Sequence, residues 1–178
     1  MHAHVILAAG QGTRMRSRLP KVLHPLLGKP MLLYALEAAL ALKPERLVVV
    51  VGHGGEKVVE ALEGYPVEVA WQKEQLGTAH ALLQAEGLLR DFPGPFLVTQ
   101  GDTPLLSPRT LEALLRRVRE GAGMALLTAE LPDPTGYGRI LRRDDGSFER
   151  IVEHKDANQK ERTIDEVNTG LMAASAKP

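Results

Sequence analysis

The sequence predicts an α/β fold with a doubly wound, mostly parallel sheet, and three observations support this class. Apolar runs of strand length alternate five times with segments of helical length and pattern along the 178 residues. Turns that contain glycine or proline separate the two kinds of segment. The run at 47–51 is one leucine followed by four valines, which is typical of a central parallel strand covered on both faces.

The first half of the chain supplies the beginning of this alternation. We expect Pro30 to be the first residue of a helix, because its fixed φ suits that position, and Pro44 to end the same helix. The sequence between these prolines is apolar on nearly every side, which predicts deep burial. Residues 10–29 are expected to form a loop. The expected strands are 4–9, 47–51 and 67–71, and the expected helices are 31–42 and 56–63.

The second half continues the alternation and adds a β-hairpin insertion. Ser107 followed by Pro108 is an N-cap with proline at the first helical position, so a helix is predicted to about Arg119. Asp145-Gly146 predicts the tight turn of the hairpin. The other expected elements are a helix at 78–89 and strands at 95–99, 124–129, 138–142, 147–152 and 164–174.

Composition excludes several classes of function. Lys+Arg and Asp+Glu are both 22, so bulk charge does not favour binding to nucleic acid or to an anionic membrane. The absence of cysteine excludes disulfides, thiolate metal sites and a cysteine nucleophile. We find no signal peptide and no apolar run of the roughly 18 residues that a membrane span needs, so a cytoplasmic protein is expected. The length predicts one domain, or one domain cut short.

Residues 7–21 have the character of a phosphate-binding segment. Gly10 and Gly12 follow the first strand, and without side chains they let backbone N–H groups approach a ligand. Gly10-Gln11-Gly12 alone also fits a simple tight turn, but the cations that come next favour phosphate. These cations are Arg14, Arg16, Arg18 and Lys21.

Two common nucleotide motifs do not fit this segment. The dinucleotide fingerprint needs a third glycine where Met15 stands, and an acid at the end of the second strand where Gly52-His53-Gly54 stands. A nicotinamide dehydrogenase is therefore disfavoured. A Walker loop is absent as well, because Gly28-Lys29 is followed by Pro30.

Other candidate residues each have a plain structural alternative. Asp102 lies at the carboxyl end of a strand, where it could cap a turn or bind the divalent cation that phosphates need. Glu153, His154 and Lys155 could be a solvated strand end, and Asn168 within an apolar run needs a polar partner that could be a ligand hydroxyl. His2 and His4 lie at an N-terminus that we expect to be ragged, so we do not expect them to form a zinc site. Asp144-Asp145 is interpreted as part of a turn rather than as a catalytic pair.

Seven segments together resemble a known family, the sugar-1-phosphate nucleotidyltransferases. Within it they resemble the uridylyltransferase half of bacterial bifunctional N-acetylglucosamine-1-phosphate uridyltransferase/glucosamine-1-phosphate acetyltransferases, over residues 4 to about 172. The segments are LAAGQGTRM at 7–15 with Pro20-Lys21, VLHPLLGKPM at 22–31, EQLGTAHA at 74–81, GDTPLL at 101–106, GYGRI at 136–140, IVEHKDA at 151–157 and EVNTG at 166–170.

The resemblance implies a nucleotide-diphospho-sugar transferase type of Rossmann-like sheet and one reaction. UTP and N-acetylglucosamine 1-phosphate give UDP-N-acetylglucosamine and pyrophosphate, with Mg²⁺ as cofactor, for the synthesis of cell-wall peptidoglycan and lipopolysaccharide. Arg14 and Lys21 would be the catalytic residues, Arg14 on the β and γ phosphates and Lys21 on the α-phosphate and sugar phosphate. Asp102 would bind the metal. The implied nucleotide-binding residues are Leu7, Ala8, Ala9, Gly10, Gly12, Lys21, Gln72, Gly77, Thr78, Gly101 and Asp102; those for the amino sugar are Gly138, Glu153 and Asn168.

Two departures from the family pattern qualify this interpretation. Gln100 stands where the family often has tyrosine, so position 100 is given no role. In the family, the catalytic domain continues for several tens of residues, and a late asparagine in that part supplies a second Mg²⁺ ligand. A second domain follows, an acetyltransferase β-helix that forms trimers and acetylates glucosamine 1-phosphate. We find no hexapeptide repeats here. Residues 1–178 are therefore expected to be a uridylyltransferase domain incomplete at its C-terminus, which could be a monomer and which binds UTP but turns over poorly.

Two alternatives remain open at this point. One is a related nucleotidyltransferase that uses another base or another sugar phosphate. Gln72 and the segment from Glu153 to Lys155 favour uridine and an N-acetylated sugar. The other is a nucleotide-binding fragment with little turnover, against which Arg14 and Lys21 argue because a pure binding module has less need of a cation at the transferred phosphate.

Overall fold

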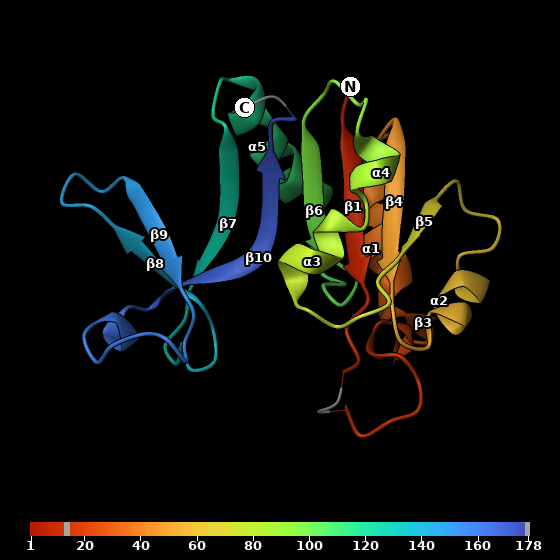
Figure 1. The fold of residues 1–178 in the computed structure, drawn as a ribbon, viewed down its shortest axis with the longest axis horizontal. Helices are drawn as coiled ribbons and strands as arrows, with labels where there is room; N and C mark the ends of the chain where they lie inside the picture. The colour runs from red at the N-terminus through yellow and green to blue at the C-terminus, as the bar shows by residue number, and fades with distance from the viewer. Residues whose placement is uncertain (13–14, 177–178) are drawn as a thin grey trace. The chain divides into compact units, whose positions relative to one another are not determined.

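A computed structural model describes residues 1–12 and 15–176 (Figure 1). The chain divides into two compact units, and each is described by itself. Unit 1 comprises residues 1–125 and 172–178, and unit 2 comprises residues 126–171. In the described part of the chain, no helix combines the length and apolar character needed to cross a membrane.

The predicted doubly wound, mostly parallel sheet is confirmed in unit 1. Its strands run in the order β5, β4, β1, β6, all parallel to their neighbours, and the last residues of β10 add an antiparallel strand beside β6. Both β1 and β4 lie in the middle, and this explains why nearly every side chain of these two strands is buried. The strand bounds are β1 (Ala3–Ala8), β4 (Arg46–Val51), β5 (Glu68–Trp71), β6 (Phe96–Gln100) and β10 (Glu166–Ala174).

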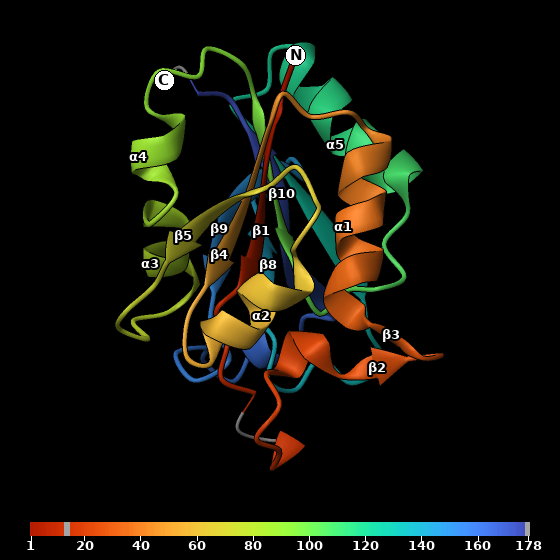
Figure 2. The same ribbon diagram turned by 90° about the vertical axis from the view of Figure 1, so that its right-hand side faces the viewer.

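Helices cover both faces of the unit 1 sheet. Seen along the sheet, α1 and α5 lie on one face, and α3 and α4 on the other (Figure 2). Because side chains alternate along a strand, Ile6 and Ala8 of β1 join the apolar cluster under α1, whereas Leu7 and Ala9 join the cluster under α3. The helix bounds are α1 (Met31–Ala41), α2 (Gly55–Ala61), α3 (Thr78–Leu83), α4 (Glu86–Leu89) and α5 (Pro108–Arg119).

Helix boundaries show where local sequence signals were sufficient. Helix α5 has the predicted bounds, and Ser107 caps it by accepting a hydrogen bond from the Thr110 N–H at 3.3 Å. The helix predicted at 78–89 is instead two short helices that break between Leu83 and Glu86. Pro30 is the N-cap of α1 rather than its first helical residue.

The expected loop at 10–29 contains short elements of its own. A 3₁₀ turn, η2 (Lys21–Leu23), is followed by a two-stranded hairpin of β2 (Pro25–Leu26) and β3 (Lys29–Pro30). Leu27 and Gly28 form its tip with φ of +51° and +83°. The hairpin was missed because leucine rarely adopts a positive φ, so residue 27 gave no turn signal.

The N-terminus is not ragged, contrary to expectation. His2 and His4 are 3% and 0% exposed, because β1 starts at Ala3, whose N–H donates to Pro95 O at 3.0 Å. The His4 Nε2 and Thr99 Oγ1 atoms lie 2.9 Å apart in a hydrogen bond. Burial lowers the pKa of His4 to about 3, so the ring is neutral in the folded chain.

Unit 2 is built from antiparallel strands. β8 (Arg139–Arg142) and β9 (Phe148–Val152) form the predicted hairpin, and Val167 of β10 pairs with Arg139 of β8. Asp145 accepts a hydrogen bond from the Ser147 N–H at 2.9 Å, which confirms the turn at this aspartate. A 3₁₀ turn, η3 (Glu161–Thr163), precedes β10.

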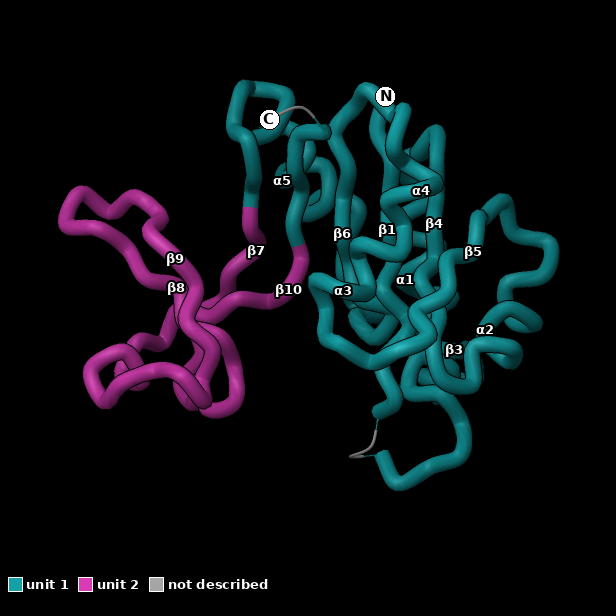
Figure 3. The backbone as a smooth tube through the Cα atoms, viewed as in Figure 1, with its two compact units in different colours: residues 1–125, 172–178 teal, residues 126–171 magenta. Residues whose placement is uncertain are grey.

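The chain passes between the units within two strands. The colours of the units meet inside β7 (Met124–Glu130) and again inside β10 (Figure 3). The strand predicted at 124–129 is therefore present as β7, but it pairs with β10 instead of extending the row of parallel strands.

Candidate active site

The glycine loop after β1 lies directly against Lys21. Gly12 has φ of +62°, and a Cβ at this position would lie 2.6 Å from the Cβ of Lys21. Only glycine accommodates both the backbone conformation and this contact. The predicted phosphate loop and the predicted phosphate cation are thus adjacent in the folded chain.

Lys21 and Asp102 form an ion pair between Nζ and Oδ2. Both side chains are partly exposed, at 35% and 26%. Asp102 follows β6, which is held beside β1 by the Gly101 N–H donating to Leu7 O at 2.9 Å. A Cβ on Gly101 would lie 3.1 Å from side-chain atoms of Leu32 and Val22, so glycine lets this turn sit close over the core.

A cavity of about 180 Å³ opens at the carboxyl ends of β1, β5 and β6. This is the edge at which open α/β sheets bind ligands. Ala8 is absent from the lining because its side chain lies in the core cluster on the other face. Six residues predicted to bind nucleotide line the cavity, namely Leu7, Ala9, Gly10, Gln72, Gly77 and Thr78; the other lining residues are Gln75, Ala81 and Gln100.

Gln72 is held in place by two hydrogen bonds. Its side chain is buried, and its Nε2 donates to Gly77 O and to Nδ1 of His80, both at 3.1 Å. An amide nitrogen is only a donor, so Nδ1 of His80 must accept. Both amide protons are then used within the protein, and the amide oxygen is the group that Gln72 has for a ligand.

Three residues of this cavity region carried no sequence prediction of a role. His80 orients Gln72, Gln75 donates from Nε2 to Ala9 O at 2.9 Å, and Gln100 lines the wall. Gln75 and His80 stand within the EQLGTAHA segment, which was noticed for its resemblance, yet nothing in a linear segment shows which side chain turns inward.

The three residues predicted to bind the sugar come together in unit 2. The Asn168 N–H donates to Gly138 O at 2.8 Å. A Cβ on Gly138 would lie 3.3 Å from Oε1 of Glu153, so the carboxylate of Glu153 lies over this glycine. Asn168 also has an internal partner, since its Oδ1 accepts from the Gly170 N–H at 3.0 Å.

A buried arginine supports this group from behind. Arg139 is 1% exposed and donates to Tyr137 O and Arg162 O, the latter at 3.5 Å, and its NH2 lies 3.3 Å from Nδ1 of His154. Burying a guanidinium requires such acceptors. Because Arg139 and His154 each adjoin a predicted sugar residue, these contacts fix the neighbouring backbone of Gly138 and Glu153.

The structure does not describe two parts of the predicted site, Arg14 and a bound metal ion. Arg14 lies outside the described residues. Within residues 1–12 and 15–176, no group of three or more His, Asp or Glu side chains could hold a metal ion. The carboxylate of Asp102 is of the ligand type suited to a cation that takes its remaining ligands from phosphate and water.

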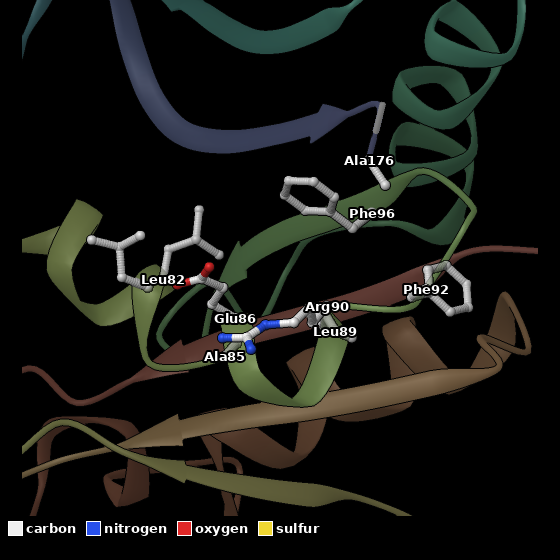
Figure 4. A pocket seen from close by; sticks show the side chains of 9 residues that line it. Leu82, Ala85, Glu86, Leu89, Arg90, Phe92, Phe96 and Ala176 are labelled. Carbon is white, nitrogen blue, oxygen red and sulfur yellow. The ribbon is translucent and has the colours of Figure 1, made fainter. Parts of the chain in front are cut away.

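Two further cavities lie in unit 1. The first, of about 270 Å³, lies between α3–α4 and the start of β6 and is mostly apolar (Figure 4). It lies away from the carboxyl strand ends, since Phe96 opens β6. The second, of about 490 Å³, has a mixed polar and apolar lining and shares Gln72 and Gln75 with the 180 Å³ cavity at the carboxyl strand ends; its other residues are Gln11, Gly52, His53, Gly54, Glu56, Trp71 and Lys73.

The sheet and the cavity at its carboxyl strand ends fit the class that a family profile identifies, an NTP transferase domain. The chain belongs to the family of MobA-like NTP transferase domains, whose family profile matches residues 4–166. Bifunctional protein GlmU of Thermus thermophilus is 89% identical over 173 residues, which are 97% of this chain and 38% of that protein. Bifunctional protein GlmU of Halorhodospira halophila is 55% identical over 98% of this chain and 36% of its own length. The chain thus spans under two fifths of these relatives.

Solved structures agree on the fold. A glucose-1-phosphate thymidylyltransferase from Bacillus anthracis, described as putative, superposes with a TM-score of 0.79 at 20% identity, over 99% of this chain and 72% of that one. UDP-glucose pyrophosphorylase in complex with UDP-glucose gives a TM-score of 0.79 at 22% identity, over 98% and 76%. At these identities the likeness establishes the α/β fold alone.

Proposed function

We propose that the chain transfers a uridylyl group from UTP to N-acetylglucosamine 1-phosphate and releases pyrophosphate. The observation that carries this proposal is the cavity at the ends of β1, β5 and β6, together with the ion pair between Lys21 of η2 and Asp102, which follows the end of β6. The similarity to bifunctional protein GlmU supports the choice of substrates. The product, UDP-N-acetylglucosamine, would serve cell-wall peptidoglycan and lipopolysaccharide synthesis in the cytoplasm.

The reaction is an in-line displacement at the α-phosphorus of UTP. An oxygen of the sugar phosphate attacks, the bond from phosphorus to the bridging oxygen breaks, and pyrophosphate leaves on the opposite side. The protein has to align two polyanions and balance their charge. Backbone N–H groups at Gly10 and Gly12 would receive the triphosphate, and Lys21 would place its ammonium on the phosphoryl oxygens where charge increases in the transition state.

Gln72 is suited to read uracil. With both amide protons engaged, its oxygen is free to accept the N3–H of the ring. Cytosine lacks that proton and would leave this acceptor unpaired, which is costly in a buried site. The backbone at Gly77 and Thr78, also in the cavity lining, would complete the recognition of the base.

Asp102 fits the role of a magnesium ligand. Mg²⁺ prefers carboxylate oxygen and keeps several waters, so one protein carboxylate together with substrate phosphate suffices to begin a site. When bound, Mg²⁺ would supply positive charge to the phosphates. Lys21 shares this carboxylate, so the ammonium and the metal would be held near the same phosphoryl group.

The unit 2 residues would bind the acceptor sugar. Glu153 would accept hydrogen bonds from its hydroxyls, and Gly138 and Asn168 would meet the N-acetyl group. Their mutual contacts support this assignment, because residues that recognise one ligand need to be held together before it binds.

The test is a pyrophosphate-release assay with N-acetylglucosamine 1-phosphate and, separately, UTP, dTTP, CTP and GTP, each with and without Mg²⁺. We expect UTP with Mg²⁺ to be the best donor. Glucose 1-phosphate in place of the N-acetylated acceptor should lower the rate. Faster release with CTP or GTP would refute the base assignment, and binding of UTP without any release would leave a nucleotide-binding fragment.

A further inference from the structure

Gln75 links two segments of the nucleotide cavity that are far apart in sequence. It stands between β5 and α3, in the segment that also carries Gln72 and Gly77. Its Nε2 donates to the carbonyl oxygen of Ala9 at 2.9 Å, 66 residues away in the chain. The orientation of the Gln75 amide is fixed by chemistry, because only the nitrogen can donate to a carbonyl. One hydrogen bond thus joins the base-side segment to the glycine loop.

The carbonyl that Gln75 holds belongs to the peptide group of Ala9 and Gly10. Described peptide bonds are all trans, and a trans peptide is planar with its C=O and N–H pointing in opposite directions. Fixing the Ala9 oxygen therefore fixes the direction of the Gly10 N–H. Without this restraint, the peptide next to glycine could rotate more freely, since glycine permits both signs of φ.

Gly52 makes room for this hydrogen bond. It follows β4, and a Cβ there would lie 2.7 Å from Nε2 of Gln75 and 2.8 Å from the oxygen of Ala9. Both distances are too short for real atoms, so any side chain at position 52 would displace the donor or the acceptor. The ends of β1, β4 and β5 therefore meet at a single contact.

We propose that Gln75 is a positioning residue that holds the Ala9–Gly10 peptide so that the Gly10 N–H is directed at the nucleotide's phosphate. This rests on the proposed function in one respect, that the ligand is a nucleoside triphosphate with its base near Gln72. Gln75 acts through the backbone of Gly10 rather than by touching the phosphate. It couples the segment that reads the base to the loop that receives the phosphates.

The test compares the affinities of UTP and of uridine by calorimetry for Gln75→Ala and Gln75→Glu. Loss of one charge-assisted contact predicts about tenfold weaker UTP binding in Gln75→Ala. Gln75→Glu should be worse, because a carboxylate would face the Ala9 oxygen. Uridine lacks phosphate, so its affinity should change less than about twofold. Gly52→Ala should repeat the pattern without changing Gln75.

The backbone amide resonance of Gly10 provides a readout that needs no nucleotide. It should shift in all three variants but not in the control, Leu76→Ala, which alters a side chain 66% exposed on the same segment. Thermal melting of each variant reports whether it folds. If a wild-type chain failed to bind UTP, the proposed function would fall, while the Gly10 shift would still report the positioning contact.

Three results would overturn the positioning role. An unchanged Gly10 resonance in folded Gln75→Ala would show that the contact does not hold the peptide. Equal losses for uridine and UTP would mean that Gln75 meets the base directly. A folded Gly52→Ala with wild-type affinity for UTP would show that the contact is not needed.

Discussion

The residues predicted to bind nucleotide, in unit 1, and those predicted to bind sugar, in unit 2, are held in place in different ways. In unit 1, the nucleotide-side residues stand where parallel strands end, above strands whose side chains are almost all buried. In unit 2, the residues predicted to bind sugar lie at or beside antiparallel strands: Gly138 precedes β8, Glu153 follows β9 and Asn168 lies in β10, and β9 is largely exposed. The large, fully buried side chains of unit 1 are mostly apolar, such as Ile6 and Leu32, whereas unit 2 buries the guanidinium of Arg139.

The difference indicates how each unit obtains precision. Topology alone brings the ends of β1, β5 and β6 to one edge, and the apolar core holds them there. Unit 2 depends on individual polar contacts, such as those of Arg139 and the Asn168–Gly138 hydrogen bond. Because the core of unit 1 already holds its strand ends, removing the charge of Lys21 should affect the chemistry and leave the rest of unit 1 in place. In unit 2, changes to space or to polar contacts should mainly affect the predicted acceptor binding.

The largest effect is expected from Lys21→Ala. Removing the ammonium from the transferred phosphate should lower kcat by about 10²–10³-fold, while UTP affinity stays largely intact. Single-turnover rates and calorimetry with UTP would measure the two quantities. Lys29→Ala is the matched control, because Lys29 pairs with exposed Glu37 and has no proposed role.

Wild-type activity in Lys21→Ala would contradict the first half of the comparison, since the ammonium of Lys21 would then not be needed for the chemistry. Weaker UTP binding with an unchanged kcat would assign Lys21 to substrate binding only.

Gly138→Ala tests the unit 2 side. A Cβ would lie 3.1 Å from Ile151 and 3.3 Å from the Glu153 carboxylate, so Glu153 must move. A cost of roughly 2 kcal/mol, about 30-fold, should appear in KM for the sugar phosphate and not in UTP affinity. Gly87→Ala, which has no atom within 4 Å of its Cβ, should have neither effect. A change confined to UTP affinity would reverse the assignment of the units.

The buried His4 makes unit 1 sensitive to acid. Burial keeps the pKa of His4 near 3, whereas the unfolded chain should titrate near 6.5, so unfolding takes up a proton between these values. The contribution is fully present above pH 6.5 and falls by about 1.4 kcal/mol per pH unit below it. Urea unfolding at pH 7.5 and 5.5 should show a smaller pH effect in His4→Gln. Equal pH dependence in the two proteins would contradict this.

The smallest effect is expected at the rim of unit 2. Arg142 pairs with Glu166 at 2.6 Å, and hydrogen bonding to Arg142 lowers the pKa of Glu166. Since both groups are partly exposed, Arg142→Ala should cost only about 0.5–1 kcal/mol of unfolding free energy near neutral pH. Arg116→Ala, which breaks an exposed pair of 3.9 Å in α5, should cost less, and equilibrium denaturation would compare them. A larger loss for Arg116→Ala would contradict this ranking.

Much of the fold could be predicted because its signals are local. Valine runs marked the central strands, and Ser107-Pro108 fixed the start of α5. The break between α3 and α4 could not be predicted, since the apolar pattern at 78–89 continues across it. The burial of His2 and His4 depends on a neighbouring strand that pairs near residue 95, which a local pattern does not reveal.

The candidate site was predicted as a set of residues but not as contacts. Motifs selected Lys21 and Asp102 separately. Their ion pair could not be predicted, because Lys21 lies in η2 and Asp102 lies after β6, about eighty residues later in the chain. The roles of Gln75 and Arg139 were missed because both depend on backbone atoms brought near by folding. The binding of nucleotide, sugar and metal by the predicted residues stays a prediction, which the assays above address.

The chain passes from unit 1 to unit 2 inside β7 and returns inside β10, and this has a consequence for how such proteins can diversify. In unit 1 the Ser175 N–H donates to Gly123 O at 2.9 Å, and in unit 2 Thr169 Oγ1 donates to Leu127 O at 2.7 Å. The outgoing and returning strands are thus neighbours on both sides of the junction. A segment joined through two adjacent strands can be lengthened, shortened or exchanged without rethreading the rest of the chain. Unit 2 is in this sense a replaceable module, and its sequence can change while unit 1 stays unchanged.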